Sequence, residues 1–207
     1  MEGEVKLNNS KLIRKFDKQA RIYDYRRRKR TERVWREKLL RGARGHVLEV
    51  AVGAGANFPY YPKGIALTAV DFSPGMLHKA ALAAADYGLH PTFIQSDVES
   101  LSFPDNSFDT IVSTLSFCGY EDPARILQAF QKWCKRDGQI LLLEHGLGSN
   151  RLVARIQNAM DPLFQTIVGC HSNRDIAGML EQSNLQIHKM ERYMFGAIHL
   201  VWAGPNK

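Results

Sequence analysis

Two glycines and two acidic residues in the first third of the chain have the types and spacing of a nucleotide-type cofactor site. Residues 47–57 (VLEVAVGAGAN) form a short apolar run that leads into a glycine loop. A second apolar run, 65–70, ends at Asp71, sixteen positions after Gly55. Glycines let the backbone approach a ligand closely, and an acid at the end of the next strand accepts hydrogen bonds from ribose hydroxyls. The pattern therefore predicts an adenosine-containing cofactor.

The loop itself narrows the choice of cofactor. A dinucleotide site has three glycines spaced to seat a pyrophosphate at a helix N-terminus, whereas this loop reads Glu49-x-Ala51-x-Gly53-x-Gly55. A carboxylate at this place repels phosphate and suits a cofactor that carries an ammonium group and a sulfonium. No Gly-Lys-Ser/Thr follows, as a Walker-type phosphate loop would require. Two glycines after a strand also form ordinary turns, but the position of Asp71 favours a cofactor.

Further motifs follow the loop in order. They are residues 69–73 (AVDFS), 95–98 (QSDV), 103–112 (FPDNSFDTIV) and 135–141 (KRDGQIL). Together with residues 47–57, they resemble the class I S-adenosylmethionine-dependent methyltransferases over nearly the whole chain. Ala51 stands where that family usually has its first glycine. The resemblance implies S-adenosylmethionine as the cofactor, S-adenosylhomocysteine as its product, and methyl transfer as the reaction.

Within the class, the chain is most similar to the branch of bacterial phospholipid N-methyltransferases and animal lipid-associated alkyl thiol methyltransferases. The shared stretches are 55–58 (GANF) before 61–62 (YP), 113–115 (STL) with Cys118, 144–145 (EH), 161–162 (DP) and 169–175 (GCHSNRD). Quinone C-methyltransferases are a more distant likeness, through 16–17 (FD) and 23–24 (YD). Acceptor pockets vary in this fold while the cofactor half stays constant, so the acceptor remains open.

The expected fold is α/β, a Rossmann-like doubly wound sheet preceded by basic helices. Apolar runs predict strands at 46–51, 66–71, 91–95, 108–113, 139–144, 185–191 and 197–203, and helices at 55–60, 74–87, 123–135, 150–168 and 173–182. The family resemblance implies seven strands with the last one antiparallel. A chain of 207 residues with 44% hydrophobic content suits one domain, 1–207. In this interpretation, residues 1–44 are a helical extension or lid, residues 45–207 are the cofactor-binding core, and about 146–174 is an acceptor-pocket insertion.

The net charge of +7 comes from the N-terminal segment. Residues 11–44 carry fifteen Lys/Arg and four Asp/Glu, whereas the rest of the chain carries thirteen and seventeen. Apolar residues recur at helical spacing there and predict two basic amphipathic helices around the run Arg26–Arg30. Such helices suit a solvated cap over the cofactor pocket, an anionic membrane surface, or nucleic acid. All three interpretations stay open.

The remaining composition favours a cytoplasmic protein, either free or peripherally attached to a membrane. No run of eighteen apolar residues is present, and the N-terminus lacks the pattern of a secretory signal. Three cysteines are an odd count without metal-like spacing in the sequence, which favours reduced thiols. We interpret Cys118 and Cys170 as small buried residues, and we predict an enzyme that needs no metal.

The cofactor is expected to contact residues at the carboxyl ends of the first four strands. Glu49, Gly53 and Gly55 are assigned to the methionine part and the loop, and Asp71 to the ribose. The adenine is expected to contact Phe72, Met76, Asp97 and Val98. Leu115 is expected to lie under the reacting sulfur. Tyr23 either closes as a lid over the methionine carboxylate or fastens the N-terminal helix to the core.

Methyl transfer from a sulfonium is an in-line displacement, which requires positioning, a dry pocket and, for some acceptors, a base. His145, after strand five, is the candidate base or hydrogen-bond anchor, because histidine titrates near physiological pH. A purely structural histidine is the alternative. The rim of the acceptor pocket is expected to include Asp161, His171, Arg174 and His199.

Two functions from different classes follow. The first is methyl transfer to a small or lipophilic acceptor: a phospholipid amine, a thiol or a quinone-like ring. The second is an RNA-directed methyltransferase, or an RNA-binding protein without activity, that uses the N-terminal basic segment. The stretch 113–117 (STLSF) after strand four is largely apolar and lacks the Asn/Asp-Pro-Pro-aromatic motif of amino-group nucleic-acid methyltransferases, which favours the first.

Overall fold

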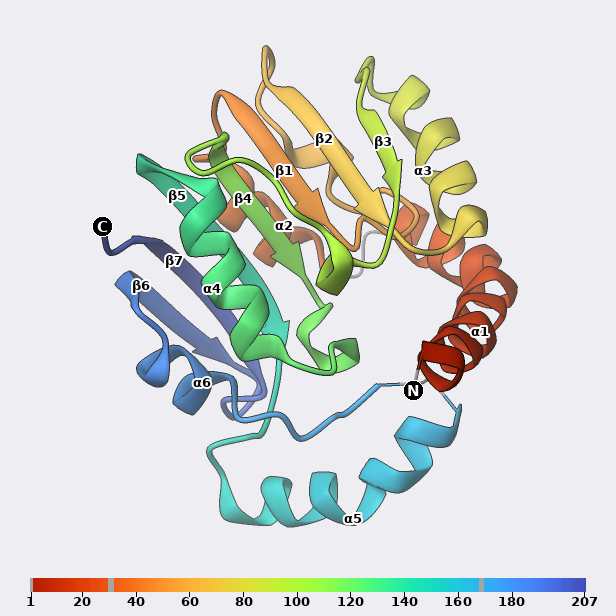
Figure 1. Ribbon diagram of the computed structural model, residues 1–207. Coiled ribbons are helices and arrows are strands. Elements are labelled where there is room, and N and C mark those ends of the chain that lie inside the picture. The colour runs from red at the N-terminus through yellow and green to blue at the C-terminus, as the bar shows by residue number, and fades with distance from the viewer. Residues whose placement is uncertain (1, 30–31, 168–169) are drawn as a thin grey trace.

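A computed structural model describes residues 2–29, 32–167 and 170–207, and the described strands form one seven-stranded sheet (Figure 1). The strands are β1 (His46–Val50), β2 (Ala66–Asp71), β3 (Thr92–Gln95), β4 (Phe108–Thr114), β5 (Cys134–His145), β6 (Leu185–Tyr193) and β7 (Ile198–Pro205). Their order is β3-β2-β1-β4-β5-β7-β6, and β7 runs antiparallel to both of its neighbours. The predicted doubly wound α/β sheet with an antiparallel last strand is confirmed.

The described residues also form six helices, which surround the sheet. They are α1 (Glu2–Lys29), α2 (Arg33–Leu40), α3 (Pro74–Asp86), α4 (Pro123–Trp133), α5 (Arg151–Ile167) and α6 (Ile176–Gln182), with short 3-10 turns η1 (Phe58–Tyr60), η2 (Val98–Ser100) and η3 (Phe117–Gly119). Helix α3 has a proline, Pro74, in its first turn. Ser73 caps it, since the Ser73 side chain accepts a hydrogen bond from the backbone of Met76. Helix α4 begins the same way, with Asp122 as its cap.

Two apolar layers sandwich the sheet because successive strand residues point to opposite faces. Leu48 and Ile111 pack with Phe130 of α4 on one face, together with α6 residues. Val47 and Leu67 pack with α2 and α3 residues on the other face. Helices α1 and α5 lie instead beyond the carboxyl ends of β1 to β5 (Figure 1), which is the edge where this fold binds ligands.

Three predictions differ most from the structure. Residues 55–60 form a turn and then η1, not a helix, because left-handed residues at 53 and 55 interrupt the chain and Pro59 lacks a backbone donor. Strand β5 begins at Cys134 instead of residue 139, since Cys134 pairs with Phe108 across a register shift. Helix α6 begins at Ile176 instead of residue 173, because Asp175 caps it through the backbone of Gly178.

The two predicted N-terminal basic helices are present as α1 and α2, and α1 is already helical at Glu2. Arg30 of the basic run and residue 168, the predicted end of the helix from 150, lie outside the described residues. Within the described residues, we find no helix with the length and apolar character required to cross a membrane.

Candidate active site

The glycine loop after β1 contains three residues with left-handed backbone conformation. The φ angles are +49° at Ala51, +55° at Gly53 and +78° at Gly55. A Cβ at Gly55 would lie 2.7 Å from the Phe58 ring, so this position requires glycine. Ala51, where the family usually has glycine, adopts the same conformation at a cost of about 1–2 kcal/mol. The loop therefore keeps the expected course despite the alanine.

Asp71 connects this loop to the start of α3. Its buried carboxylate accepts hydrogen bonds from the backbone of Gly53 at 2.9 Å and from the backbone of Ser73 at 2.9 Å. Burial raises its pKa to about 6, while these backbone hydrogen bonds oppose the shift. Each carboxylate oxygen has a second lone pair, which leaves capacity for ribose hydroxyls.

Helix α1 lies over this part of the sheet edge. Asp17 accepts hydrogen bonds from the Ser73 hydroxyl at 2.6 Å and from the backbone of Gly75 at 2.9 Å, at the start of α3. The Phe16 ring meets the Phe72 ring edge-on, with 5.2 Å between centroids. The sequence analysis quoted Asp17 only as part of the 16–17 stretch and gave it no role, although an acid that meets the N-terminus of another helix is favourable.

Tyr23, further along α1, lies over the glycine loop. A Cβ at Gly53 would lie 3.8 Å from its ring. Burial raises the Tyr23 pKa to about 12, and the nearby thiols of Cys118 and Cys170 add to the shift. The ring thus lies between the cofactor loop and the acceptor side, as a lid residue would.

The four residues predicted for the adenine lie at the ends of β2 and β3, which pair so that Asp71 stands opposite Gln95. Met76 and Val98 are buried, and Phe72 is half-buried. Asp97 accepts a hydrogen bond from the backbone of Glu99 at 3.0 Å and so caps η2. The fold therefore gathers all four at one edge of the sheet.

Glu49 belongs to a buried polar cluster beneath the loop. Its two carboxylate oxygens accept hydrogen bonds from Asn57 at 2.9 Å and from the Tyr61 hydroxyl at 2.8 Å. Buried Arg36 of α2 donates to Asn57 at 2.7 Å and to Thr114 at 2.9 Å. Burial raises the Glu49 pKa to about 7. Each of its oxygens accepts a hydrogen bond from the protein, so Glu49 helps to hold the loop in place. Arg36 was missed because it appears as one more residue of a basic helix.

The turn after β4 is held by Glu144 of β5. This buried carboxylate accepts hydrogen bonds from the Ser113 hydroxyl at 2.8 Å and from the backbone of Ser116 and Phe117 at 2.9 and 3.1 Å. Burial raises its pKa to about 7. Leu115, between these residues, has a φ of +56° and donates its backbone N–H to Leu143 at 2.7 Å. The turn thus keeps Leu115 in a strained conformation at the ligand edge.

The acceptor side gathers residues that are far apart in the sequence. Asp161 of α5 accepts hydrogen bonds from the backbone of Ser172 at 2.6 Å and lies 2.9 Å from His171 Nδ1. The backbone of His171 donates to the carbonyl of Cys118 at 2.9 Å. Arg174 donates to the carbonyl of Tyr120. Three of the four predicted rim residues therefore fasten segment 170–175 onto α5 and η3.

His199 is the exception among the predicted rim residues. It stands opposite Glu144 in the β5–β7 register, and paired residues share a sheet face, so it lies on the face opposite to that of the adjacent His145. It is buried, and burial lowers its pKa. This places His199 inside the sheet packing and away from His145.

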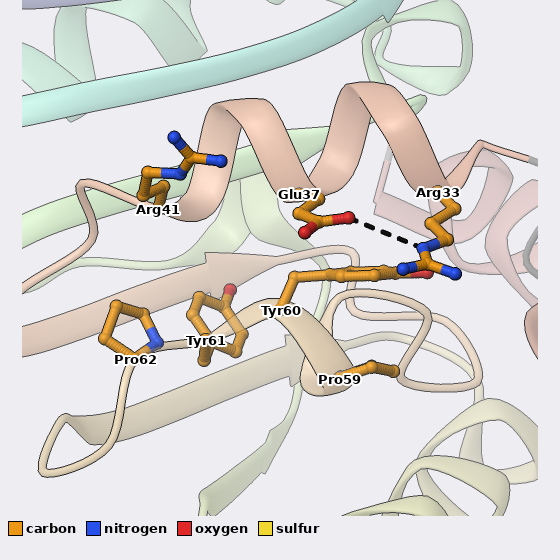
Figure 2. A pocket seen from close by; sticks show the side chains of 7 residues that line it. All are labelled: Arg33, Glu37, Arg41, Pro59, Tyr60, Tyr61 and Pro62. Atoms are coloured by element: carbon orange, nitrogen blue, oxygen red, sulfur yellow. Dashed lines mark hydrogen bonds and ion pairs between the residues drawn. The ribbon is translucent and has the colours of Figure 1, made fainter.

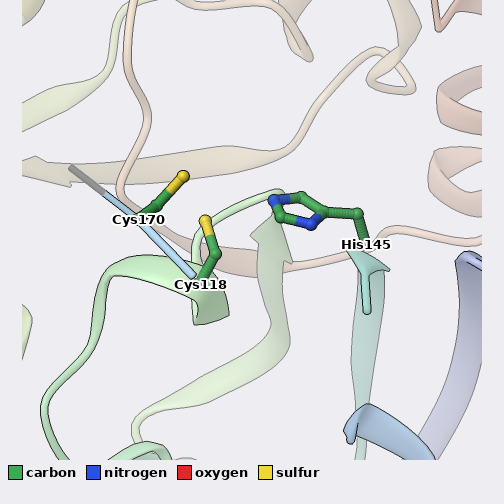
Figure 3. Close-up of side chains that lie close together, drawn as sticks. All are labelled: Cys118, His145 and Cys170. Atoms are coloured by element: carbon green, nitrogen blue, oxygen red, sulfur yellow. The ribbon is translucent and has the colours of Figure 1, made fainter. Parts of the chain in front are cut away.

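His145, at the end of β5, points toward two thiols (Figure 3). One ligand atom each of Cys118, His145 and Cys170 lies within 4.8 Å of the other two. The hydrogen bond between the two cysteines, together with burial, raises the pKa of Cys118, while the same bond lowers that of Cys170. The sequence interpretation treated the cysteines as small buried residues, because at least 25 positions separate each ligand from the next along the chain and no short motif marks the cluster.

A separate cavity lies on the surface beside α2. A groove of about 430 Å³ runs between α2 and the loop after η1, and Figure 2 shows the residues that line it. They are Arg33, Glu37, Arg41, Pro59, Tyr60, Tyr61 and Pro62. None of them was predicted to touch the cofactor or the acceptor. Tyr61 connects the groove to the site only through its hydrogen bond with Glu49.

A glycine loop after β1 and an acid at the end of β2, on a seven-stranded sheet with an antiparallel β7, are typical of one enzyme class, and comparisons with known proteins agree. Residues 48–142 match the model of the methyltransferase domain family. Phosphatidylethanolamine N-methyltransferase of Cereibacter sphaeroides is 30% identical over 145 residues, which cover 69% of this chain and 71% of that protein. The chain is a class I S-adenosylmethionine-dependent methyltransferase.

Other relatives of this methyltransferase act on different acceptors by name. Thiol S-methyltransferase TMT1B of Rattus norvegicus is 29% identical over 195 residues, which cover 90% of this chain and 75% of that protein. The ubiquinone/menaquinone C-methyltransferase UbiE of Bdellovibrio bacteriovorus is 33% identical over 120 residues, which cover 55% and 51%. Relatives named for a phospholipid, a thiol and a quinone are therefore all 29–33% identical to this chain over the residues that match.

Solved structures agree on the fold. In a Haloferax volcanii complex of the Trm112 activator with a putative methyltransferase, the matched chain has a TM-score of 0.70 at 16% identity, over 92% of this chain and 97% of that one. PH0226 of Pyrococcus horikoshii has a TM-score of 0.66 at 20% identity, over 87% and 91%.

Proposed function

We propose that this methyltransferase transfers the methyl group to a lipophilic acceptor that reaches the site from a membrane or micelle surface. The observation that carries the proposal is one face of α5. Six large apolar side chains, each at least 38% exposed, recur there at helical spacing: Leu152, Ile156, Met160, Leu163, Phe164 and Ile167. The tip of the β6–β7 hairpin adds exposed Met194 and Phe195 beside the start of the helix, where Ser149 donates its backbone N–H to Phe195.

This face is connected to the acceptor side. Asp161, on the same helix, holds Ser172 and His171 and hence segment 170–175. An apolar helix face of this size is costly in water and favourable in the boundary region of a lipid surface. Exposed Arg151 and Arg155, at the start of α5, suit anionic head groups. A lipophilic acceptor could then pass from the surface along α5 to Leu115 and His145.

The cofactor half supplies the positioning. We infer that Asp71 holds the ribose, that Gly53 and Gly55 admit the methionine part, and that Phe72, Met76, Asp97 and Val98 surround the adenine. Leu115 lies under the sulfonium, Tyr23 closes over it, and Glu49 supports the loop from below. No side chain needs to form a covalent bond, because displacement at the methyl carbon is direct. When no metal is bound, His145 takes a proton from the acceptor where the acceptor carries one.

We further propose one domain in which residues 45–207 form the core, residues 1–44 form the lid and residues 146–174 line the acceptor pocket. The enzyme acts in the cytoplasm at an anionic membrane surface, with residues 11–44 contributing general attraction and α5 the apolar contact. Nucleic acid is a weaker partner, because Arg26, Arg27 and Arg28 already form ion pairs with Glu32 and Asp24.

The test measures S-adenosylhomocysteine formation with a long-chain alkyl thiol, phosphatidylethanolamine vesicles, a quinol and RNA at matched salt concentration. We expect turnover with at least one lipophilic acceptor. Turnover with RNA alone would contradict the proposal.

Cosedimentation with anionic vesicles then tests the surface: Leu163→Ser with Phe164→Ser should weaken binding at least about tenfold, since full burial of one such side chain contributes roughly 1.5–3 kcal/mol. Leu82→Ser on α3, at a site that is 54% exposed, is the matched control and should bind normally. Equal binding by both variants would exclude α5 as the contact.

A further inference from the structure

Three side chains with good affinity for soft metals meet at the carboxyl ends of β4 and β5. Cys118 comes from η3, His145 from the last position of β5, and Cys170 from the segment after α5 (Figure 3). Their ligand atoms all lie within 4.8 Å of one another. Cys118 is buried, while His145 and Cys170 are half-buried, so one side of the cluster stays accessible.

The backbone around the two cysteine ligands is fixed by hydrogen bonds. Glu144 holds the backbone of Ser116 and Phe117, directly before Cys118. The chain after Cys170 is held by Asp161 through Ser172, and His171 bonds to the carbonyl of Cys118. Supporting contacts of this kind orient metal ligands in advance. They raise the affinity for the metal, because the ligands lose little conformational freedom on binding.

We propose that Cys118, His145 and Cys170 bind Zn²⁺ and leave its fourth position open toward the acceptor pocket. Tetrahedral zinc with bonds of about 2.0–2.3 Å holds its ligand atoms roughly 3.5–3.8 Å apart, so the distances between ligand atoms need to shorten by about 1.3 Å at most. Two thiolates and an imidazole select zinc over magnesium or calcium. Three protein ligands with an open position are the arrangement of catalytic rather than structural zinc sites.

The location gives the site a use that rests on the proposed function. The Cys118 thiol lies 3.8 Å from the carbonyl of Leu115, the residue expected under the sulfonium. An acceptor thiol that takes the fourth position loses its proton to solvent and is held as a thiolate. Its sulfur then bonds to the methyl carbon as the sulfonium–methyl bond breaks, which gives neutral S-adenosylhomocysteine and a thioether. The thioether is a weaker ligand than the thiolate and leaves. The zinc site therefore favours thiols among the lipophilic acceptors.

The experiment measures metal binding directly and needs no turnover. Full-length protein is reduced, stripped with a chelator and titrated with Co²⁺ and Zn²⁺. We expect one ion per chain, and a cobalt complex with thiolate charge-transfer absorption and the strong visible bands of tetrahedral geometry. Cys118→Ser and Cys170→Ser should each weaken binding at least about 100-fold. Cys134→Ala is the matched control, because Cys134 lies buried at the start of β5, outside the cluster, and this variant should bind normally.

Several outcomes would overturn the zinc site. One is the absence of cobalt binding by reduced, folded protein, and another is equal binding by Cys118→Ser and the unchanged chain. Circular dichroism and S-adenosylmethionine titration of each variant check that the fold and the cofactor half are intact. Those controls separate the two proposals: methyl transfer to a lipophilic acceptor by folded protein that binds no cobalt would leave the proposed function standing and remove the zinc site.

Discussion

The cofactor half and the acceptor half of this methyltransferase are built by different means. In the cofactor half, Asp71, Gly53 and Ser73 are near neighbours along two consecutive strands, and backbone hydrogen bonds hold them. In the acceptor half, Asp161, His171 and Cys118 come from separate segments and meet through one turn and one helix. The first half is thus defined by local chain geometry, and the second by long-range packing. This difference agrees with a fold that keeps its cofactor while its acceptor changes.

The largest effect on the cofactor half is expected in the buried cluster of Arg36, Glu49 and Asn57 below the glycine loop. Arg36→Met removes the donor to Asn57 and Thr114 and leaves the Glu49 carboxyl without a nearby cation. We expect the free energy of unfolding to fall by about 3–5 kcal/mol, as for a buried charge that loses its partner. Urea denaturation measures it.

The matched control is Arg33→Met, one turn earlier on α2. Arg33 forms an exposed ion pair with Glu37, so a change below about 1 kcal/mol is expected. If the two variants were equally stable, the cofactor half would not depend on this cluster, and local geometry alone would hold the loop.

A second prediction concerns the cofactor itself. Asp71→Ala removes the proposed ribose contact and also the acceptor for Gly53 and Ser73. Hydrogen bonds to a charged group contribute about 1.5–3 kcal/mol each, so we expect the dissociation constant for S-adenosylmethionine to rise at least about 100-fold. Isothermal titration with S-adenosylmethionine and S-adenosylhomocysteine measures it. Asp105→Ala, an exposed acid after β3, should bind like the unchanged chain; unchanged binding by Asp71→Ala would remove Asp71 from the site.

A third prediction addresses the acceptor half through pH. Burial raises the pKa of Glu144 from its ordinary value of 4.5 to about 7, so the folded state binds this proton more tightly than the unfolded chain. Its contribution to stability is therefore greatest below about pH 4.5 and is lost as pH rises through about 7. Glu144→Gln should flatten the fall in stability across this window by about 1–3 kcal/mol.

Urea denaturation at several pH values between 5 and 7.5 measures the slope. Glu181→Gln, on the exposed side of α6, should leave it unchanged. A slope that is the same in both variants would mean that the turn around Leu115 does not depend on the buried state of Glu144.

Much of the fold followed from the sequence because strand and helix signals are local. Pro74 and Pro123 mark helix starts, and the apolar runs of β1, β2 and β4 were placed within one residue. The prediction of a helix at 55–60 was wrong because the left-handed backbone at Gly53 and Gly55 turns the chain there. The spacing of apolar residues carries no information about the sign of φ. The start of β5 was predicted five residues too late, because the pairing of Cys134 with Phe108 is a contact made only in the assembled sheet.

The sequence by itself determined the reaction class, because the glycine loop, Asp71 and the later motifs occur in a fixed order along neighbouring strands. Only the tertiary structure decided that Glu49 supports the loop through Asn57 and Tyr61, that Cys118, His145 and Cys170 converge, and that α5 exposes an apolar face. The physical reason is range. The backbone conformation and the spacing of apolar residues depend on neighbours in the sequence. The convergence of side chains at a site and the exposure of a helix face depend instead on which distant segments pack together.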